Sequence, residues 1–403
     1  MASLVASFKY TLELTLLIDN SSYVIESNSV NSIIIDNNYD KNNMPIIYLS
    51  IRLNSTMYNR MVRNTNIGIL NMRLFKFNDT GVSVRNEPYI EDRFIYMMST
   101  DPNYDESSER LTSDSATGNT ENSGSYLEGY IGLISVKSVN DNKELFNDII
   151  KNTDSLSVVH KYTKHMTMCI EPFDNNPNID QFIIPPITSI TNLLKYLNNY
   201  FCFYNSGYRY FRDFDITYLL SMKGVPVKTK NSIYNSVIIS IQDPLEASGK
   251  VNSMEIDNVN HAYIIYVDAN STSINIDKVT NKSFNTIIGV DTLGNTLKEE
   301  LDLPDTPDFT EKVILERVNK NNLNKILNTK AAIESLSVTL TITKAEIDST
   351  ILTPNKEYQV KNYSGSKEYD GRYVLSFKKE IMYKQNDKYI GNVIFGLRRV
   401  TED

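Results

Sequence analysis

Two histidines and a cysteine lie close together in the sequence and could form a metal site or a nucleophilic pair. His160, His165 and Cys169 are separated by five and four residues. A structural zinc site needs four ligands, commonly in tighter C-x-x-C or H-x3-H pairs, and the sequence contains no second pair. A Cys-His nucleophile also needs an orienting group and an oxyanion hole, which no recognisable spacing supplies. The pattern therefore favours partly buried structural residues.

A pair of aspartates, Asp213 and Asp215, could serve acid–base chemistry or metal binding. On a strand, residues two apart face the same side, so both carboxylates would point together. The adjacent Arg212 and the flanking aromatic residues favour instead a strand with ion pairs near a domain boundary. Three further acidic residues are expected to be solvated surface charges: Glu299, Glu300 and Glu380.

The signatures of common enzyme mechanisms are absent from the sequence. It contains no G-x-x-x-x-G-K-[ST] phosphate loop, no G-x-G-x-x-G dinucleotide turn, no H-E-x-x-H zinc helix and no G-x-S-x-G nucleophile elbow. We therefore assign no catalytic, cofactor-binding or metal-binding residue, expect no cofactor, and predict that the protein is not an enzyme.

Aromatic residues gather between positions 196 and 214, where they could form a stacking platform or a core. A platform would bind bases or sugars through the ring faces, whereas a core would bury the rings in the fold or at a subunit interface. The chain carries a net charge of −8 and the cluster has few basic residues, which favours a core and subunit interface. The cluster comprises Tyr196, Tyr200, Phe201, Phe203, Tyr204, Tyr208, Tyr210, Phe211 and Phe214.

Length and composition indicate several globular domains. At roughly 100–200 residues per domain, 403 residues correspond to two to four domains. The hydrophobic share of 41% supplies material for cores and excludes wholesale disorder. The negative charge and a pI near 5.2 argue against a general affinity for DNA or anionic lipid.

The cysteine count and the distribution of apolar residues indicate where the chain is made and whether it contains a membrane segment. Cys169 and Cys202 are the only cysteines, which excludes a disulfide framework and favours synthesis in a reducing cytoplasm. The N-terminus lacks a basic region and an uninterrupted apolar core, and no window reaches 18 apolar residues. We therefore expect neither a signal peptide nor a membrane anchor.

The first 98 residues are predicted to form an antiparallel β domain. Residues 8–16 alternate strictly between apolar and polar side chains, and similar runs follow at 46–53 and 69–77. Residues 99–127 form an acidic insertion rich in Ser and Asn, which cannot bury enough apolar area to order itself alone. We expect this insertion to contact a neighbouring protein.

Residues 128–225 are predicted to form a mixed α/β (α+β) domain. Strands are expected at 131–139 and 166–172, and a short helix is expected at 141–152. A second helix is expected at 189–201, where Ile190, Leu193, Leu194 and Leu197 repeat at helical spacing after a proline-rich entry.

Residues 226–403 are predicted to form a second β domain with one long helix. The helix is expected at about 307–328, since Thr306 can cap it and Pro307 suits its first turn. Strands are expected at 233–242, 261–267, 336–343, 358–362, 372–384 and 389–399. The last two are joined by the short polar segment 385–388, which is typical of a hairpin.

Five segments of the chain carry a family resemblance. They are 42–47 (NNMPII), 170–176 (IEPFDNN), 182–186 (FIIPP), 205–215 (NSGYRYFRDFD) and 370–377 (DGRYVLSF). Together they resemble the hub proteins of phage tail baseplates, a family that includes the central hub of T-even contractile tails and the late-control D proteins. The shared residues are packing and turn residues, and the resemblance spans most of the chain.

The resemblance implies two tail-tube-like β-barrel domains with a smaller mixed domain inserted between them. It implies a homotrimer whose six barrels form a pseudo-sixfold ring between a sixfold tail tube protein and a threefold central spike protein. Baseplate wedge or tape-measure proteins would be neighbours, and DNA would pass through an acidic lumen without specific binding. Such a protein is assembled in the host bacterial cytoplasm and resides in the virion tail.

Two other interpretations stay open from the sequence alone. One is a receptor- or glycan-binding tail protein, possibly glycan-cleaving, that uses the tyrosine-rich surface and the pair Asp213 and Asp215. The other is a related hub of a non-contractile tail or of a contractile injection particle. Since the sequence ends soon after a strand, we expect the spike and any cell-wall hydrolase to be separate chains.

Overall fold

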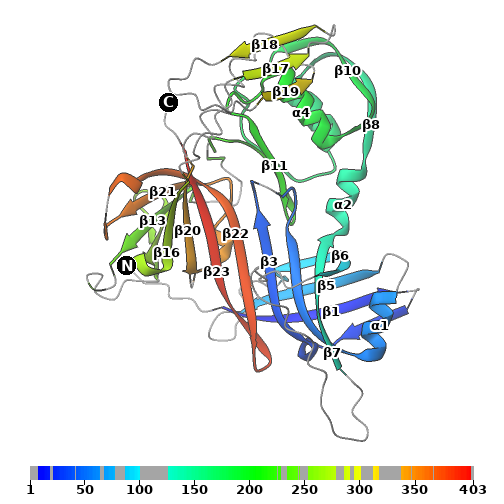
Figure 1. The fold of residues 1–403 in the computed structure, drawn as a ribbon, viewed down its shortest axis with the longest axis vertical. Coiled ribbons are helices and arrows are strands. Elements are labelled where there is room, and N and C mark those ends of the chain that lie inside the picture. The colour runs from blue at the N-terminus through cyan, green and yellow to red at the C-terminus, as the bar shows by residue number, and fades with distance from the viewer. Residues whose placement is uncertain are drawn as a thin grey trace, which may run out of the picture.

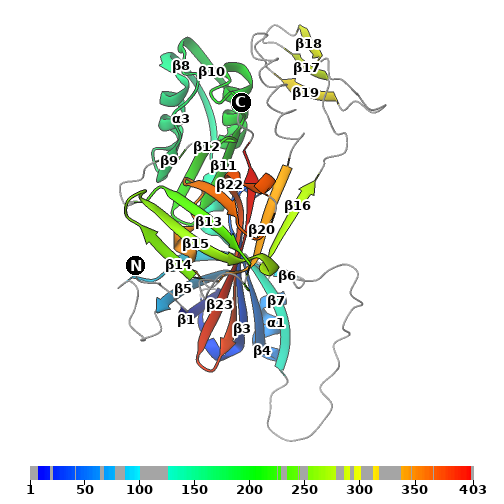
Figure 2. The same cartoon turned by 90° about the vertical axis from the view of Figure 1, so that its left-hand side faces the viewer.

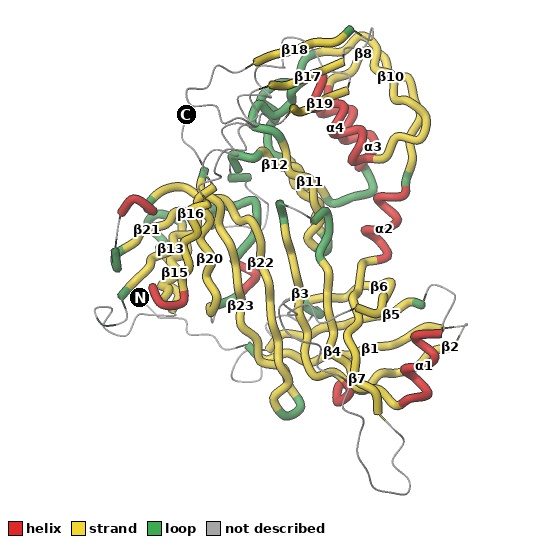
Figure 3. The backbone as a smooth tube through the Cα atoms, in the orientation of Figure 1, coloured by secondary structure: helices red, strands yellow, loops and turns green. Residues whose placement is uncertain are grey.

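Strands dominate the molecule, and most of them belong to one continuous hydrogen-bonded sheet (Figures 1 and 3). The computed structural model describes residues 8–18, 21–40, 42–63, 68–77, 87–99, 126–224, 226–227, 234–243, 245, 253–277, 286–290, 295–300, 312–316, 337–345, 347–365 and 367–400. The acidic insertion predicted at 99–127 therefore lies almost wholly outside the described residues. No helix in the described ranges is long and apolar enough to cross a membrane.

The elements follow one another in three groups. The first contains β1 (Lys9–Ile18), β2 (Ser21–Ile25), η1 (Ser27–Ser29), β3 (Val30–Asn38), β4 (Ile46–Asn54), α1 (Ser55–Arg63), β5 (Ile69–Phe77), β6 (Ile90–Ser99) and β7 (Tyr126–Ser135). The second contains α2 (Val136–Lys143), β8 (Leu145–Asp154), α3 (Ser155–Thr163), β9 (Met168–Ile170), β10 (Asn178–Ser189), α4 (Ile190–Phe201), β11 (Tyr208–Asp213) and β12 (Ile216–Ser221). The third contains β13 (Ser236–Gln242), β14 (Ser253–Asp257), β15 (Ala262–Asp268), η2 (Ala269–Ser271), β16 (Thr272–Asp277), β17 (Thr286–Val290), β18 (Thr296–Glu300), β19 (Lys312–Glu316), β20 (Ser337–Ala345), η3 (Ser349–Ile351), β21 (Glu357–Asn362), η4 (Lys367–Tyr369), β22 (Gly371–Gln385) and β23 (Lys388–Arg399).

Eight strands close into a circle, which we call the ring. Their order is β22-β3-β4-β7-β6-β5-β1-β23, and β22 and β23 pair with each other to complete it. The predicted strands at 8–16, 46–53 and 69–77 are confirmed as β1, β4 and β5. Closure leaves the ring without an unpaired edge. The ring therefore takes strands from both the beginning and the end of the chain.

Apolar side chains fill the ring. Leu16, Ile33 and Leu49 point inward and are fully buried, as the alternation along each strand requires. Helix α1 lies at one mouth, where Met61 is buried and its carbonyl oxygen accepts a hydrogen bond from the Tyr96 hydroxyl at 3.2 Å. The ring is thus a packed core rather than a pore.

A second assembly, the C-terminal sheet, also contains eight strands. Their order is β14-β15-β13-β21-β22-β23-β20-β16. The strands predicted in this part of the sequence are confirmed as β13, β15, β20, β21, β22 and β23. The sheet has its own core, in which Tyr358, Leu375 and Phe395 are fully buried. The predicted mainly β fold with an inserted α+β part is confirmed.

Helix α2 leads from the ring to a mixed region that we call the upper module (α3, α4 and β8 to β12). Figure 2 shows β8, β10 and α3 at the end of the molecule opposite the strands β3 and β4. The predicted helix at 189–201 is confirmed as α4, which begins where the Ser189 hydroxyl accepts from the amide of Asn192 at 3.3 Å. Helix α3 was not predicted. Its start is marked by Asp154, whose carboxylate accepts from the amide of Ser157 at 2.9 Å.

The predicted helix at 141–152 is wrong. The helix ends earlier, as α2, and residues 145–154 form strand β8, which pairs with β10. Apolar residues at 145, 146, 149 and 150 fit a helical face, but Phe146 points into the core whereas Leu145 and Ile149 are 55% and 58% exposed. Pairing with β10 therefore outweighed the helical spacing.

The predicted helix at 307–328 is also wrong where it can be compared. Residues 312–316 form strand β19, which runs parallel to β17 in a sheet with β18. Val313 and Ile314 are β-branched residues that favour a strand once a partner strand is available. The rest of the predicted helix lies outside the described residues.

Candidate functional site: the hairpin shared by the ring and the C-terminal sheet

The hairpin β22–β23, which we call the shared hairpin, belongs to both β assemblies. Residues 377–383 of β22 pair with β3 in the ring, whereas residues 371–373 pair with β21 in the C-terminal sheet. β23 likewise pairs with β1 at residues 389–390 and with β20 at residues 393–398. The predicted turn is confirmed, and Asn386 adopts a φ of 55°, a conformation that asparagine tolerates well. This hairpin therefore joins the two assemblies covalently and by hydrogen bonds.

Glu380 lies inside this junction, so its prediction as a solvated surface charge is wrong. It is 2% exposed and accepts hydrogen bonds from the hydroxyls of Tyr89 at 2.7 Å and Ser349 at 2.9 Å. The ammonium of Lys378 lies 3.8 Å from its carboxylate. Residues 378, 380 and 382 share the inward face of β22, so the charge pair occupies positions that alternation assigns to the core. In the sequence, the run of three charged residues Lys378-Lys379-Glu380 suggests an exposed segment, so the burial of Glu380 was not predicted.

Lys76 and Asp348 form a second buried pair next to Glu380. The Lys76 ammonium lies 2.5 Å from the Asp348 carboxylate and 4.0 Å from the centre of the Phe8 ring, and the Lys76 side chain is only 5% exposed. Burial alone would raise the pKa of Asp348, but the charge of Lys76 and hydrogen bonds from Lys76 and Thr350 outweigh it and hold that pKa below its ordinary value. The pair ties strand β5 of the ring to helix η3 beside the C-terminal sheet.

A third lysine, Lys356, completes what we call the lysine–acid network (Lys76, Asp348, Lys356, Lys378 and Glu380). Its ammonium donates to the carbonyl oxygen of Ile351 at 2.7 Å and lies 4.8 Å from the centre of the Tyr263 ring. Burial lowers the pKa of Lys356 to about 8, against an opposing effect of Asp348. Burial also raises the pKa of Tyr89 well above its ordinary value, with the charge of Glu380 adding to the effect, so this tyrosine remains a donor.

The β11–β12 turn connects the upper module to the ring and contains the two aspartates singled out in the sequence. Asp213 ends β11, and Phe214 and Asp215 form the turn, so the two carboxylates do not share the face of one strand. Asp213 accepts hydrogen bonds from the Asn37 side chain at 3.3 Å and from the Tyr39 hydroxyl at 3.0 Å. The expected ion pair near the boundary is present, since Arg212 pairs with Asp141 of α2.

The aromatic cluster lies mostly in cores. Phe203 and Tyr204 are fully buried in the upper module, and Phe211 is 1% exposed in the core of the C-terminal sheet. The Tyr204 hydroxyl donates to the carbonyl oxygens of Glu171 at 2.5 Å and Leu219 at 3.2 Å. The prediction of a core is confirmed for these three residues, whose ring faces are covered by protein.

The histidines and the cysteine do not converge on one point. His165 is paired with Asp141 at 3.6 Å and Glu144 at 3.4 Å, His160 is exposed on α3, and Cys169 is buried in β9. Burial raises the pKa of Cys169 to about 11, with the charge of Glu171 adding to the effect, which keeps the thiol protonated. Within the described ranges, no group of three or more His, Cys, Asp or Glu side chains could hold a metal ion. Glu299 and Glu300 lie on β18, and their side chains are outside the description.

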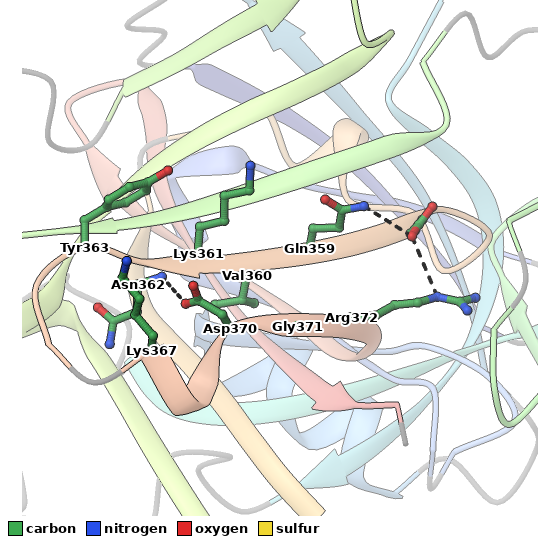
Figure 4. Close-up of a pocket in the computed structure, with 10 residues that line it drawn as sticks. Gln359, Val360, Lys361, Asn362, Tyr363, Lys367, Asp370, Gly371 and Arg372 are labelled. Atoms are coloured by element: carbon green, nitrogen blue, oxygen red, sulfur yellow. Dashed lines mark hydrogen bonds and ion pairs between the residues drawn. The ribbon is translucent and has the colours of Figure 1, made fainter. Parts of the chain in front are cut away.

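A cavity of about 400 Å³ lies beside strand β21 and the start of β22 (Figure 4). Its polar groups are partly engaged with one another. Glu357 accepts from the Gln359 side chain at 3.4 Å and lies 3.8 Å from Arg372, and Asp370 accepts from the amide of Asn362 at 2.7 Å. The cavity therefore shows internal pairing rather than a set of groups converging on a substrate.

The fold is shared with known tail proteins. A tail protein from Neisseria meningitidis MC58 is similar, with a TM-score of 0.50 and 10% identity over 96% of this chain and 97% of that one. The 43 kDa tail protein of prophage MuSo2 from Shewanella oneidensis is similar with a TM-score of 0.48 and 10% identity, over 96% of each chain. The resemblance noted in the sequence is thus confirmed at the level of the fold. A search of curated proteins finds no significant match. The family model described as Bacteriophage PBS1 gene 109 protein matches residues 1–400, and the chain belongs to that family.

Proposed function

We propose that this protein is the structural hub of a phage tail baseplate, in which three copies form a pseudo-sixfold ring between a sixfold tail tube and a threefold central spike. The observation that carries the proposal is the presence of two eight-stranded β assemblies in one chain, joined by the shared hairpin. Three chains with two β assemblies each can match a sixfold partner on one side and a threefold partner on the other.

The family and the fold support a place in the virion tail. The family description names a bacteriophage, and the fold is that of a tail protein from Neisseria meningitidis MC58. Assembly would take place in the host bacterial cytoplasm, with the tail tube protein, the spike protein and wedge or tape-measure proteins as partners. The insertion at 99–127 would contact one of these neighbours.

The packed interior of the ring restricts where DNA could pass. Side chains fill the circle of strands, so a channel must lie between subunits rather than through one of them. A net charge of −8 would disfavour adhesion of DNA to such a channel. We also propose that the protein has no enzymatic activity.

The alternative of a glycan-binding tail protein loses part of the residues on which it rested. Asp213 is engaged by Asn37 and Tyr39, and the central rings of the aromatic cluster are buried, whereas Asp215 is exposed.

Light scattering of the purified protein over a concentration series tests the proposal. We expect a particle of three times the 46.1 kDa chain mass, either alone or after addition of a spike protein. A protein that stays monomeric with every candidate spike protein would overturn the hub assignment.

A further inference from the structure

Three arginines from three strands lie around one turn at the base of the upper module. We call them the arginine cluster: Arg209 on β11, Arg372 on β22 and Arg398 on β23. Two of them hold the turn at residues 222–224. Arg398 donates to the carbonyl oxygen of Met222 at 3.2 Å, and Arg372 donates to that of Gly224 at 3.0 Å. The cluster thus links the end of β12 to the shared hairpin.

Carboxylates lie near these guanidinium groups, but not within short hydrogen-bond distance. Asp40 lies between two of them, with oxygens 3.6 Å from Arg209 and 3.5 Å from Arg398. Glu357 lies 3.8 Å from Arg372. These separations exceed those of charge-assisted hydrogen bonds, which are about 2.7–2.9 Å. Asp40 also accepts a hydrogen bond from the hydroxyl of Ser376, so its charge is shared among several donors.

Several buried donors of the cluster have no hydrogen-bond partner among the residues that the structure describes. They are Nε and Nη2 of Arg209, Nε of Arg398 and Nε of Arg372. The side chain of Arg209 is only 2% exposed, whereas those of Arg398 and Arg372 are 12% and 30% exposed. Burial lowers the pKa of Arg209, and the nearby charge of Arg398 adds to this effect, whereas the carboxylates of Asp40 and Glu171 oppose it. Buried donors without partners and neighbouring positive charges both destabilise the folded protein.

Gly224 lets the turn approach these donors closely. Its φ is +60°, and a Cβ there would lie 2.3 Å from Cγ1 of Val374 and 3.7 Å from Nη2 of Arg209. A larger residue would clash with Val374 of β22.

We propose that Arg209, Arg372 and Arg398 bind a small oxyanion of the phosphate type beside the turn at residues 222–224. Guanidinium groups match the geometry of phosphate oxygens and can bind them with two parallel hydrogen bonds. The anion would accept from the donors that lack hydrogen-bond partners among the described residues. The upper module would then be fixed to the shared hairpin more firmly when the anion is bound. This site is independent of the proposed hub function.

The test is thermal unfolding of the full-length protein, followed by tyrosine fluorescence, in potassium phosphate and in potassium chloride of equal ionic strength. We expect phosphate to raise the Tm in a saturable way, by at least about 2 °C beyond chloride. Equilibrium dialysis with radiolabelled phosphate should give one phosphate per chain. Equal effects of the two salts on the Tm, together with no phosphate retained in dialysis, would overturn the site.

Three variants locate the effect. Arg398→Gln should abolish the phosphate-dependent rise, whereas Arg52→Gln, at a 58% exposed arginine on β4, should keep it. Asp40→Asn removes the competing carboxylate and should enlarge the rise, which provides a readout if Arg398→Gln does not fold. A rise that is unchanged in both Arg398→Gln and Asp40→Asn would show that phosphate binds elsewhere and would overturn the proposal.

Discussion

The lysine–acid network and the arginine cluster are two buried groups of charges, and both touch the shared hairpin, but they are satisfied to different degrees. In the network, Asp348 and Glu380 accept short hydrogen bonds from Lys76, Tyr89 and Ser349. In the arginine cluster, Asp40 stands 3.5–3.6 Å from two guanidinium groups, and four buried donors lack a hydrogen-bond partner in the described part of the chain.

This difference separates two kinds of junction. The network connects the ring to the C-terminal sheet, and both of its carboxylates accept short hydrogen bonds. The arginine cluster connects the upper module to the shared hairpin, and some of its buried N–H donors have no hydrogen-bond partner among the described residues. The second junction is therefore the one whose stability should respond to ions in solution, and substitutions in the two groups should have different effects.

The largest effect is expected from Asp348→Ala, which leaves the buried ammonium of Lys76 without its partner. Removal of one member of a buried ion pair destabilises a protein by about 3–5 kcal/mol. Urea denaturation should show a loss of this size in the free energy of unfolding.

The matched control is Glu128→Ala, which breaks the exposed ion pair with Arg52 at 3.8 Å. We expect this change to stay within about 0.5 kcal/mol. The double variant Lys76→Met/Asp348→Ala should recover part of the loss, because no unpaired charge remains buried. A loss in Asp348→Ala as small as that in Glu128→Ala would contradict the role given to the network.

An intermediate effect is expected from Gly224→Ala at the arginine cluster. The substitution imposes a φ of +60° on alanine and places its Cβ 2.3 Å from Cγ1 of Val374. We expect a loss of about 1–3 kcal/mol in the free energy of unfolding. Gly365→Ala is the control, since its Cβ would lie 3.6 Å from the Asn362 side chain, an ordinary contact. Equal stability of the two variants would show that the turn is not held closely against β22.

Much of the fold could be predicted from the sequence, whereas the junctions could not. Alternation identified β1, β4 and β5 because each buries one face against a single core. Local spacing misassigned 141–152 and 312–316, where pairing with a distant strand decides the structure. The lysine–acid network and the arginine cluster could not be predicted from the sequence for a similar reason. Lys76 and Asp348 are 272 residues apart, and no local pattern marks two charges that meet only after the ring has closed.

The smallest effect is expected from Lys356→Met, a substitution in the lysine–acid network. Burial lowers the pKa of Lys356 to about 8 in the folded protein, below its ordinary value of 10.5. Below pH 8 the lysine is charged in both states, and burial of that charge destabilises the fold. Between pH 8 and pH 10.5 the unfolded chain binds more protons than the folded one, so the contribution of this residue to stability rises with pH.

Methionine removes the buried charge but also the hydrogen bond to Ile351. At pH 7 the variant should therefore gain about 1–2 kcal/mol over the wild type. This advantage should shrink as the pH rises from 8 to 10.5, which urea denaturation at pH 7 and pH 10 can measure. Lys361→Met, at an exposed lysine on β21, should change the stability little at either pH. An advantage for Lys356→Met that is the same at both pH values would show that the gain arises from packing, and that the third lysine of the network carries no buried charge.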